Sequence, residues 1–161
     1  MKLHNVIVAL ALVLAVSCNA ERRTEVEITG QNGPEFRLHG SGTLAYFAVF
    51  SPSYVAEARE PNDLRVAIWL IAPSGDRKRV EDISVVRYGV LPNGYKQEYP
   101  IGRRPEPLVE GQQYYFHVDT RNAPGASWYV SIRGGRPMLV EGEHVCFGAK
   151  DGEWFRKPCE K

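Results

Sequence analysis

The sequence predicts an all-β domain arranged as a two-sheet antiparallel sandwich of immunoglobulin-like type, with a small β-barrel as the alternative. Two observations support this. From Thr24 onward, short runs rich in Val, Ile, Tyr and Phe alternate with clusters of Gly, Pro, Asn and Asp, as strands alternate with turns. No stretch sustains a helical period, apart from a short turn around residues 54–60. Strands are expected at residues 24–29, 35–40, 43–50, 64–72, 82–90, 112–120, 127–134, 137–142, 143–148 and 153–157.

The alternation within the longer runs predicts which side chains form the core, because successive side chains of a strand point to opposite faces. The run 64–72 is apolar on both faces beyond Arg65, which indicates a central strand with Trp69 covered by a loop. The expected core sets of two later runs are Tyr114, Phe116, Val118, Trp128, Val130 and Ile132. The sets on the opposite, wetter faces are Tyr115, His117, Asp119, Tyr129, Ser131 and Arg133.

The chain begins with the layout of a secretory leader. Lys2 precedes an unbroken apolar run from Val6 to Val16, and the small Ser17 and Cys18 follow. The run is too short for a hydrocarbon core about 30 Å thick, which needs roughly 20 residues. The sequence therefore predicts export, with residues 1–18 as a signal peptide.

Cys18 allows two cleavage sites. The segment at residues 15–18 resembles the lipobox of bacterial lipoproteins, which implies a cut before Cys18 and a diacylglyceryl group on its sulfur. Ala15 departs from that family, which more often has leucine there. The alternative cut follows Ala20, with Cys18 and Ala20 as the small residues of an ordinary secretory site. Lipidation is favoured, and a short tether at residues 19–23 would join the anchor to a single domain at residues 24–161.

The two cuts imply different locations. Lipidation of Cys18 predicts a membrane-anchored, periplasm-facing lipoprotein of the bacterial cell envelope. In a Gram-negative envelope, Asn19 stands where family rules place an aspartate for inner-membrane retention, which favours the outer membrane. Cleavage after Ala20 would instead give a soluble periplasmic or secreted protein.

Cys146 and Cys159 are the other two cysteines of the chain. In an exported protein, a cysteine pair near the end of the chain is more typical of a disulfide than of a metal site. The spacing matches no zinc pattern. We expect a disulfide that closes a C-terminal hairpin, with two free buried thiols as the alternative.

The charge balance argues against nucleic-acid binding. Lys2 is the one charged residue of the leader, so 19 basic residues face 19 acidic ones in the remaining chain. A near-neutral domain offers no reason to expect a concentrated basic face. Glycine loops of the nucleotide-binding kinds and amphipathic membrane-surface helices are missing from the sequence, and no cofactor is expected.

His117 is the main candidate for catalysis. It shares a strand face with Asp119, which could orient the imidazole for acid–base chemistry, although no partner nucleophile can be named. A solvent-facing polar pair is the favoured interpretation. Joint metal ligation by His117 and His144 would need convergence in space, and no metal site is predicted.

The segment 89–111 is the candidate interaction loop, because its four prolines and four glycines prevent much of it from pairing in a central sheet. It carries Tyr95, Tyr99, Arg103 and Arg104, residue types that are enriched where proteins bind partners. The favoured alternative is a turn at residues 92–94, an edge strand, and tyrosines that cover the sandwich.

The stretches FRLHGSGTLAYFAVF (36–50) and VVRYGVLPNGYKQEYP (85–100) resemble small uncharacterised exported bacterial proteins that are regarded as β-sandwich lipoproteins, and the resemblance spans roughly residues 30–135. The resemblance implies fold and compartment and carries over no functional residue. The predicted function is a non-catalytic, exported binding or assembly module of the cell envelope, with an envelope protein as the expected kind of partner. The alternative is a periplasmic or secreted hydrolase-like enzyme with a site assembled around His117.

Overall fold

The computed structural model describes residues 22–29, 34–76, 78–83, 85–140, 146–151 and 153–157. The strands are β1 (Glu25–Thr29), β2 (Glu35–His39), β3 (Thr43–Phe50), β4 (Ala67–Pro73), β5 (Val85–Arg87), β6 (Tyr95–Tyr99), β7 (Gln113–Arg121), β8 (Ala126–Arg133), β9 (Arg136–Val140), β10 (Cys146–Lys150) and β11 (Glu153–Lys157). The helical turns are α2 (Tyr54–Glu57), η1 (Leu64–Val66) and α3 (Val80–Ile83).

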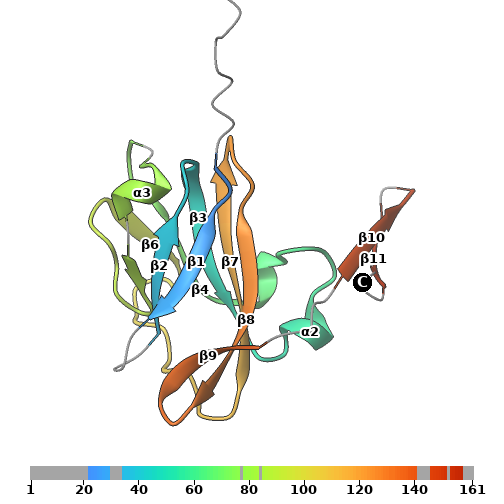
Figure 1. Cartoon of the computed structure of the whole chain (residues 1–161). Coiled ribbons are helices and arrows are strands. Elements are labelled where there is room, and N and C mark those ends of the chain that lie inside the picture. Colours follow the sequence, from blue (N-terminus) through green and yellow to red (C-terminus); the bar gives the residue numbers. More distant parts are fainter. Residues whose placement is uncertain are drawn as a thin grey trace, which may run out of the picture.

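Two antiparallel sheets lie face to face (Figure 1). One has the strand order β1-β2-β5 and the other β6-β4-β3-β7-β8-β9, while β10 and β11 pair only with each other. The predicted all-β sandwich is therefore confirmed. The barrel alternative is wrong, because β6 and β9 remain separate edges of the larger sheet. The immunoglobulin-like type stays a prediction.

The main core lies between the two sheets. Phe36 of β2 is fully buried, with its ring centroid 4.5 Å from that of Phe116 and 5.6 Å from that of Phe47. Burial of one such side chain contributes about 2 kcal/mol. Both predicted core sets are buried here, namely Tyr114, Phe116, Val118, Trp128, Val130 and Ile132. Trp69 of the central strand β4 is also buried, as expected. Tyr88, in the loop after β5, covers it edge-on, with the two ring centroids 5.3 Å apart.

A second apolar cluster covers the outer face of the larger sheet. The connection from Ser51 to Val66 folds across this face, and the ring of Tyr54 stacks on that of Tyr115 at 4.3 Å. Tyr129 and Ser131 are buried as well, so the prediction of a wetter face at these two positions is wrong. The ring of Tyr129 packs against that of Tyr115 at 5.0 Å, and Tyr115 is itself covered by Tyr54 from a distant part of the chain.

Two expected strands begin later than predicted because aspartates cap helical turns at their starts. The Asp63 carboxylate accepts the Arg65 N–H and holds residues 64–66 in a 3-10 turn, so β4 begins at Ala67. The Asp82 carboxylate accepts the Arg79 N–H at 3.2 Å, as in a capping box, and β5 is reduced to three residues. The turn around residues 54–60 is confirmed as α2. The other eight expected strands are confirmed, with ends shifted by up to two residues where the chain is described; residues 141–145, expected in two of these strands, lie outside the described residues.

The predicted leader, Cys18 and most of the tether lie outside the described residues. From Arg22 the chain is attached to the sandwich, since the Arg22 N–H donates to Ser41 Oγ at 2.7 Å. Cys146 opens β10, but Cys159 lies outside the described residues, so the disulfide stays a prediction. Within the described ranges, no helix has the length and apolar character needed to cross a membrane.

Candidate ligand-binding cleft

A cleft of about 500 Å³ opens at one end of the six-stranded sheet. β3 and β6 end there, while β4 and β7 begin there. Ile68 and Tyr114 line the cleft where it meets the main core, and Pro52 lines it from the connection after β3. The remaining lining comes from the Pro-rich segment 99–112. The cleft therefore joins segments from four parts of the chain.

Gln97 of β6 holds the start of this segment. Its Oε1 accepts the indole N–H of Trp69 at 3.0 Å, and its Nε2 donates to the carbonyl oxygens of Pro100 and Arg103. Because the Trp69 ring is fully buried, the Gln97 amide is held in one orientation. The backbone beside Arg103 is thereby fixed to the sheet.

The middle and the end of the segment are held by two tyrosine hydroxyls and by main-chain hydrogen bonds. Tyr88 Oη donates to the Glu106 carbonyl oxygen, and Tyr114 Oη accepts the Val109 N–H, each at 2.8 Å. Burial raises the pKa of the Tyr88 hydroxyl, which keeps it a donor at neutral pH. Gly111 N–H donates to the Ile132 carbonyl oxygen at 2.9 Å. The loop is thus anchored along its length, and the cleft is formed before any ligand arrives.

The lining combines apolar surface with a positive rim. Its charged side chains are Arg103, Arg104 and Glu106, and all three are exposed. None of them takes part in an ion pair within the described part of the chain. Two guanidinium groups against one carboxylate leave this rim with net positive charge.

Three of the four residues of the predicted interaction loop line this cleft, namely Tyr99, Arg103 and Arg104. Tyr95 does not, because its side chain is 5% exposed and packs in the main core. Burial raises its pKa to about 12. The turn at residues 92–94 and the edge strand β6 are both confirmed, since Tyr95 N–H donates to the Pro92 carbonyl oxygen.

A β-bulge explains why the two tyrosines of β6 have different roles. Gln97 pairs with Ile71 and Tyr99 pairs with the adjacent Leu70, so Glu98 is the extra residue on β6. Such an insertion reverses which face the next side chain occupies. Tyr99 is consequently 45% exposed at the cleft instead of following Tyr95 into the core.

His117 is buried, and the prediction of a solvent-facing pair with Asp119 is wrong for it. It is 7% exposed, with the rings of Tyr46 and Tyr115 at centroid distances of 5.6 and 6.5 Å. Its Nδ1 lies 2.7 Å from Ser127 Oγ, and its buried Nε2 has no hydrogen-bond partner among the described residues. Burial lowers its pKa to about 4. Neither His117 nor Ser127 lines the cleft.

Metal ligation by His117 and His144 is not tested, because His144 lies outside the described residues. Among the residues that are described, no three His, Cys, Asp or Glu side chains gather as metal ligands would.

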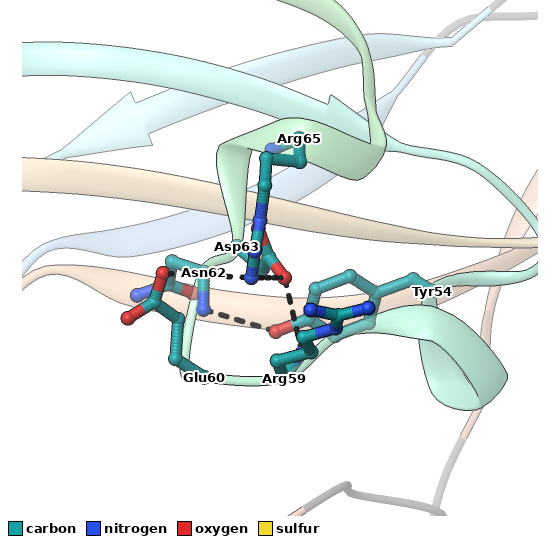
Figure 2. Close-up of polar contacts among 6 residues, drawn as sticks. All are labelled: Tyr54, Arg59, Glu60, Asn62, Asp63 and Arg65. Carbon is teal, nitrogen blue, oxygen red and sulfur yellow. Dashed lines mark hydrogen bonds and ion pairs between the residues drawn. The ribbon is translucent and has the colours of Figure 1, made fainter. Parts of the chain in front are cut away.

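A second polar cluster surrounds Asp63 (Figure 2). Its carboxylate is 3% exposed and accepts from the N–H groups of Arg59 and Arg65 at 3.0 and 3.2 Å. It also accepts from Arg65 Nε and Nη2, at 2.7 and 2.6 Å. Hydrogen bonds from the Arg65 side chain are the main cause that lowers the Asp63 pKa to about 2. Nearby, Tyr54 Oη accepts the Asn62 N–H, so this cluster holds the 51–66 connection in its folded shape. Asn62 Oδ1 accepts from Tyr115 Oη of β7 at 2.9 Å, which joins the connection to the sheet.

The Asp63 carboxylate has no capacity left for a ligand, because four donors already occupy it. We therefore assign this cluster a structural role, and the cleft remains the candidate binding site. Residue type and spacing do not indicate Pro52, Ile68 or Tyr114 as cleft residues, since these three come from separate segments outside the loop.

The resemblance of residues 36–50 and 85–100 to exported bacterial proteins stays a prediction, and the inference of function has to start from the cleft. No family model matches this chain, and neither a curated protein nor a solved structure matches it.

Proposed function

We propose that the protein is a non-catalytic binding module of the bacterial cell envelope, exported and lipid-anchored through Cys18, and that it binds its ligand in the cleft described above. The observation that carries this proposal is the anchoring of the 99–112 segment by Gln97, Tyr88 and Tyr114. A loop held at its start, middle and end loses little conformational entropy when a ligand binds.

The size and lining of the cleft support a binding role. Its volume of about 500 Å³ falls within the range of roughly 300–1,000 Å³ that is usual for ligand sites. Its walls are mainly proline, tyrosine and aliphatic side chains, with few polar groups among them. Apolar walls with a small number of placed polar groups are the usual composition of such sites.

The proposed anchor would keep the cleft close to a membrane. The sandwich is attached from Arg22 onward, four residues after Cys18. An extended chain spans at most about 3.5 Å per residue, so the domain would lie within roughly 14 Å of the lipid headgroups. The proposed Cys146–Cys159 disulfide would close the C-terminal hairpin in the same oxidising compartment.

The test is site-specific photo-cross-linking in the native envelope. A photoreactive phenylalanine analogue at position 99 should form one discrete adduct, large or small, that is identified by its mass. The same analogue at Arg136, which is exposed on β9, is the matched control. Equal adducts at the two positions, or no adduct at position 99, would contradict the proposal.

One observation favours a hydrolase as second candidate, namely the 2.7 Å contact between Ser127 Oγ and His117 Nδ1. Against it, a histidine with a pKa of about 4 is a weak base at neutral pH, and no hydrogen bond joins it to Asp119. A fluorophosphonate probe that labels Ser127 in the wild type, but not in His117→Gln, would favour the enzyme. We expect no labelling of Ser127.

A further inference from the structure

The charge and the shape of the cleft together indicate the chemical class of its ligand. We propose that the cleft binds a small amphipathic anion, with one carboxylate or phosphate group attached to an apolar body. This inference rests on the proposed function, because it assumes that the cleft is the binding site. It adds which group of the ligand meets which side chains.

The anionic group follows from the two arginines at the rim. Arg103 and Arg104 are consecutive and exposed, and among the described residues neither has a carboxylate within 4.0 Å, although Glu106 lines the same cleft. Gln97 holds the Arg103 carbonyl oxygen at 2.6 Å, so the first guanidinium extends from a fixed point of the backbone. Planar guanidinium groups match carboxylate and phosphate oxygens in pairs of hydrogen bonds.

The apolar body follows from the surface between this rim and the core. Ile68 and Tyr114 line the inner part of the cleft, while Tyr99 and Val109 keep about half of their surface exposed. Inorganic phosphate would leave this apolar surface in water, and a neutral apolar molecule would leave both exposed guanidinium groups to water alone. Only a ligand with both parts uses the whole lining.

Binding of anilinonaphthalene sulfonate to the purified protein tests this inference, with neutral anilinonaphthalene as the comparison probe. Replacing Arg103 and Arg104 together by Gln should lower the affinity for the sulfonate probe about three- to tenfold, as expected for two exposed charge contacts. The affinity for the neutral probe should not change. Glu106→Gln removes the opposing charge and should strengthen sulfonate binding about twofold. The control variant replaces Arg121 and Arg136, both exposed and outside the cleft lining, and should bind both probes as the wild type does.

Competition separates the two sources of the anionic group. We expect decanoate or decyl phosphate to displace the sulfonate probe. Because the two alkyl chains have nearly the same length, the stronger competitor identifies a carboxylate or a phosphate ligand. Acetate, inorganic phosphate and decanol at the same concentrations should displace little. Displacement by decanol as strong as by decanoate would overturn the inference.

Two further results would overturn the inference of an amphipathic anion and still be compatible with the proposed function. One is an unchanged affinity for the sulfonate in the Arg103→Gln, Arg104→Gln variant with an unchanged melting temperature. The other is a position-99 adduct whose mass identifies a neutral molecule or a protein segment. In contrast, absence of any adduct at position 99 would count against the proposed function itself.

Discussion

Replacing Asp63 by Asn should destabilise the fold by about 1–2 kcal/mol at neutral pH. The Asp63 pKa falls from 3.8 to about 2 on folding, and one pKa unit corresponds to about 1.4 kcal/mol, which sets an upper bound near 2.5 kcal/mol. The Arg65 side chain is 58% exposed, so solvent screening reduces this value to the expected range. The melting temperature should fall by roughly 3–8 °C.

The pH dependence of this loss has a definite sign. A carboxyl group whose pKa is lowered by folding stabilises the protein above its unfolded pKa and loses that effect as the pH falls through the folded value. The difference between wild type and Asp63→Asn should therefore be complete at pH 7. It should shrink between about pH 4 and pH 2, where Asp63 becomes protonated.

Urea unfolding followed by tryptophan fluorescence measures both effects, at pH 7 and near pH 2.5. Glu60→Gln is the matched control, because Glu60 also contacts Arg65, at 3.8 Å, but its side chain is 50% exposed. This control should lose less than about 0.5 kcal/mol. A loss of equal size at both pH values, or a control loss as large as that of Asp63→Asn, would refute the reasoning.

Four further predictions concern the cleft, the buried histidine and the cysteines. Gln97→Leu should speed hydrogen exchange of the 99–112 amides and lower the affinity for the sulfonate probe. Unchanged exchange would contradict the anchoring role of Gln97. By NMR, His117 should titrate near pH 4, and stability should fall from pH 6.5 to 4 because the unfolded imidazole binds the proton first; a midpoint near 6.5 would be contrary. Cys18→Ser should release the protein from membranes, whereas a wild-type N-terminus at residue 21 would exclude lipidation. Cys146 and Cys159 should react with thiol reagents only after reduction, and rapid labelling would exclude the disulfide.

The sandwich could be predicted because its main core depends on local alternation. In β7 and β8, every second residue faces the smaller sheet, and the sequence shows this directly. The outer face could not be predicted in the same way. Its polar members Tyr115, His117 and Ser131 look solvated in the sequence. In the structure, Tyr54 of a distant connection stacks on Tyr115, and His117 packs against the rings of Tyr46 and Tyr115.

The cleft was partly predictable for a similar reason. The density of proline and glycine after residue 89 indicates a long loop. The composition of that loop marks Tyr99, Arg103 and Arg104 as candidate binding residues, and all three line the cleft. That Tyr99 reaches the cleft while Tyr95 packs in the core depends on the bulge at Glu98, for which neither residue type nor spacing gives a signal.

The cleft lies where two long connections meet on one sheet, and each is held by its own polar side chain, the buried Asp63 or the half-buried Gln97. Pro52 belongs to the connection that Asp63 clamps, while the 99–112 segment depends on Gln97. Pro52 is also held next to β4, because the Ser51 N–H donates to the Val66 carbonyl oxygen at 3.0 Å. Loosening the Asp63 clamp should therefore lower stability and leave probe binding nearly intact, whereas Gln97→Leu should affect binding more than stability. Stability and binding can thus be separated within one small sandwich, since they depend on different connections.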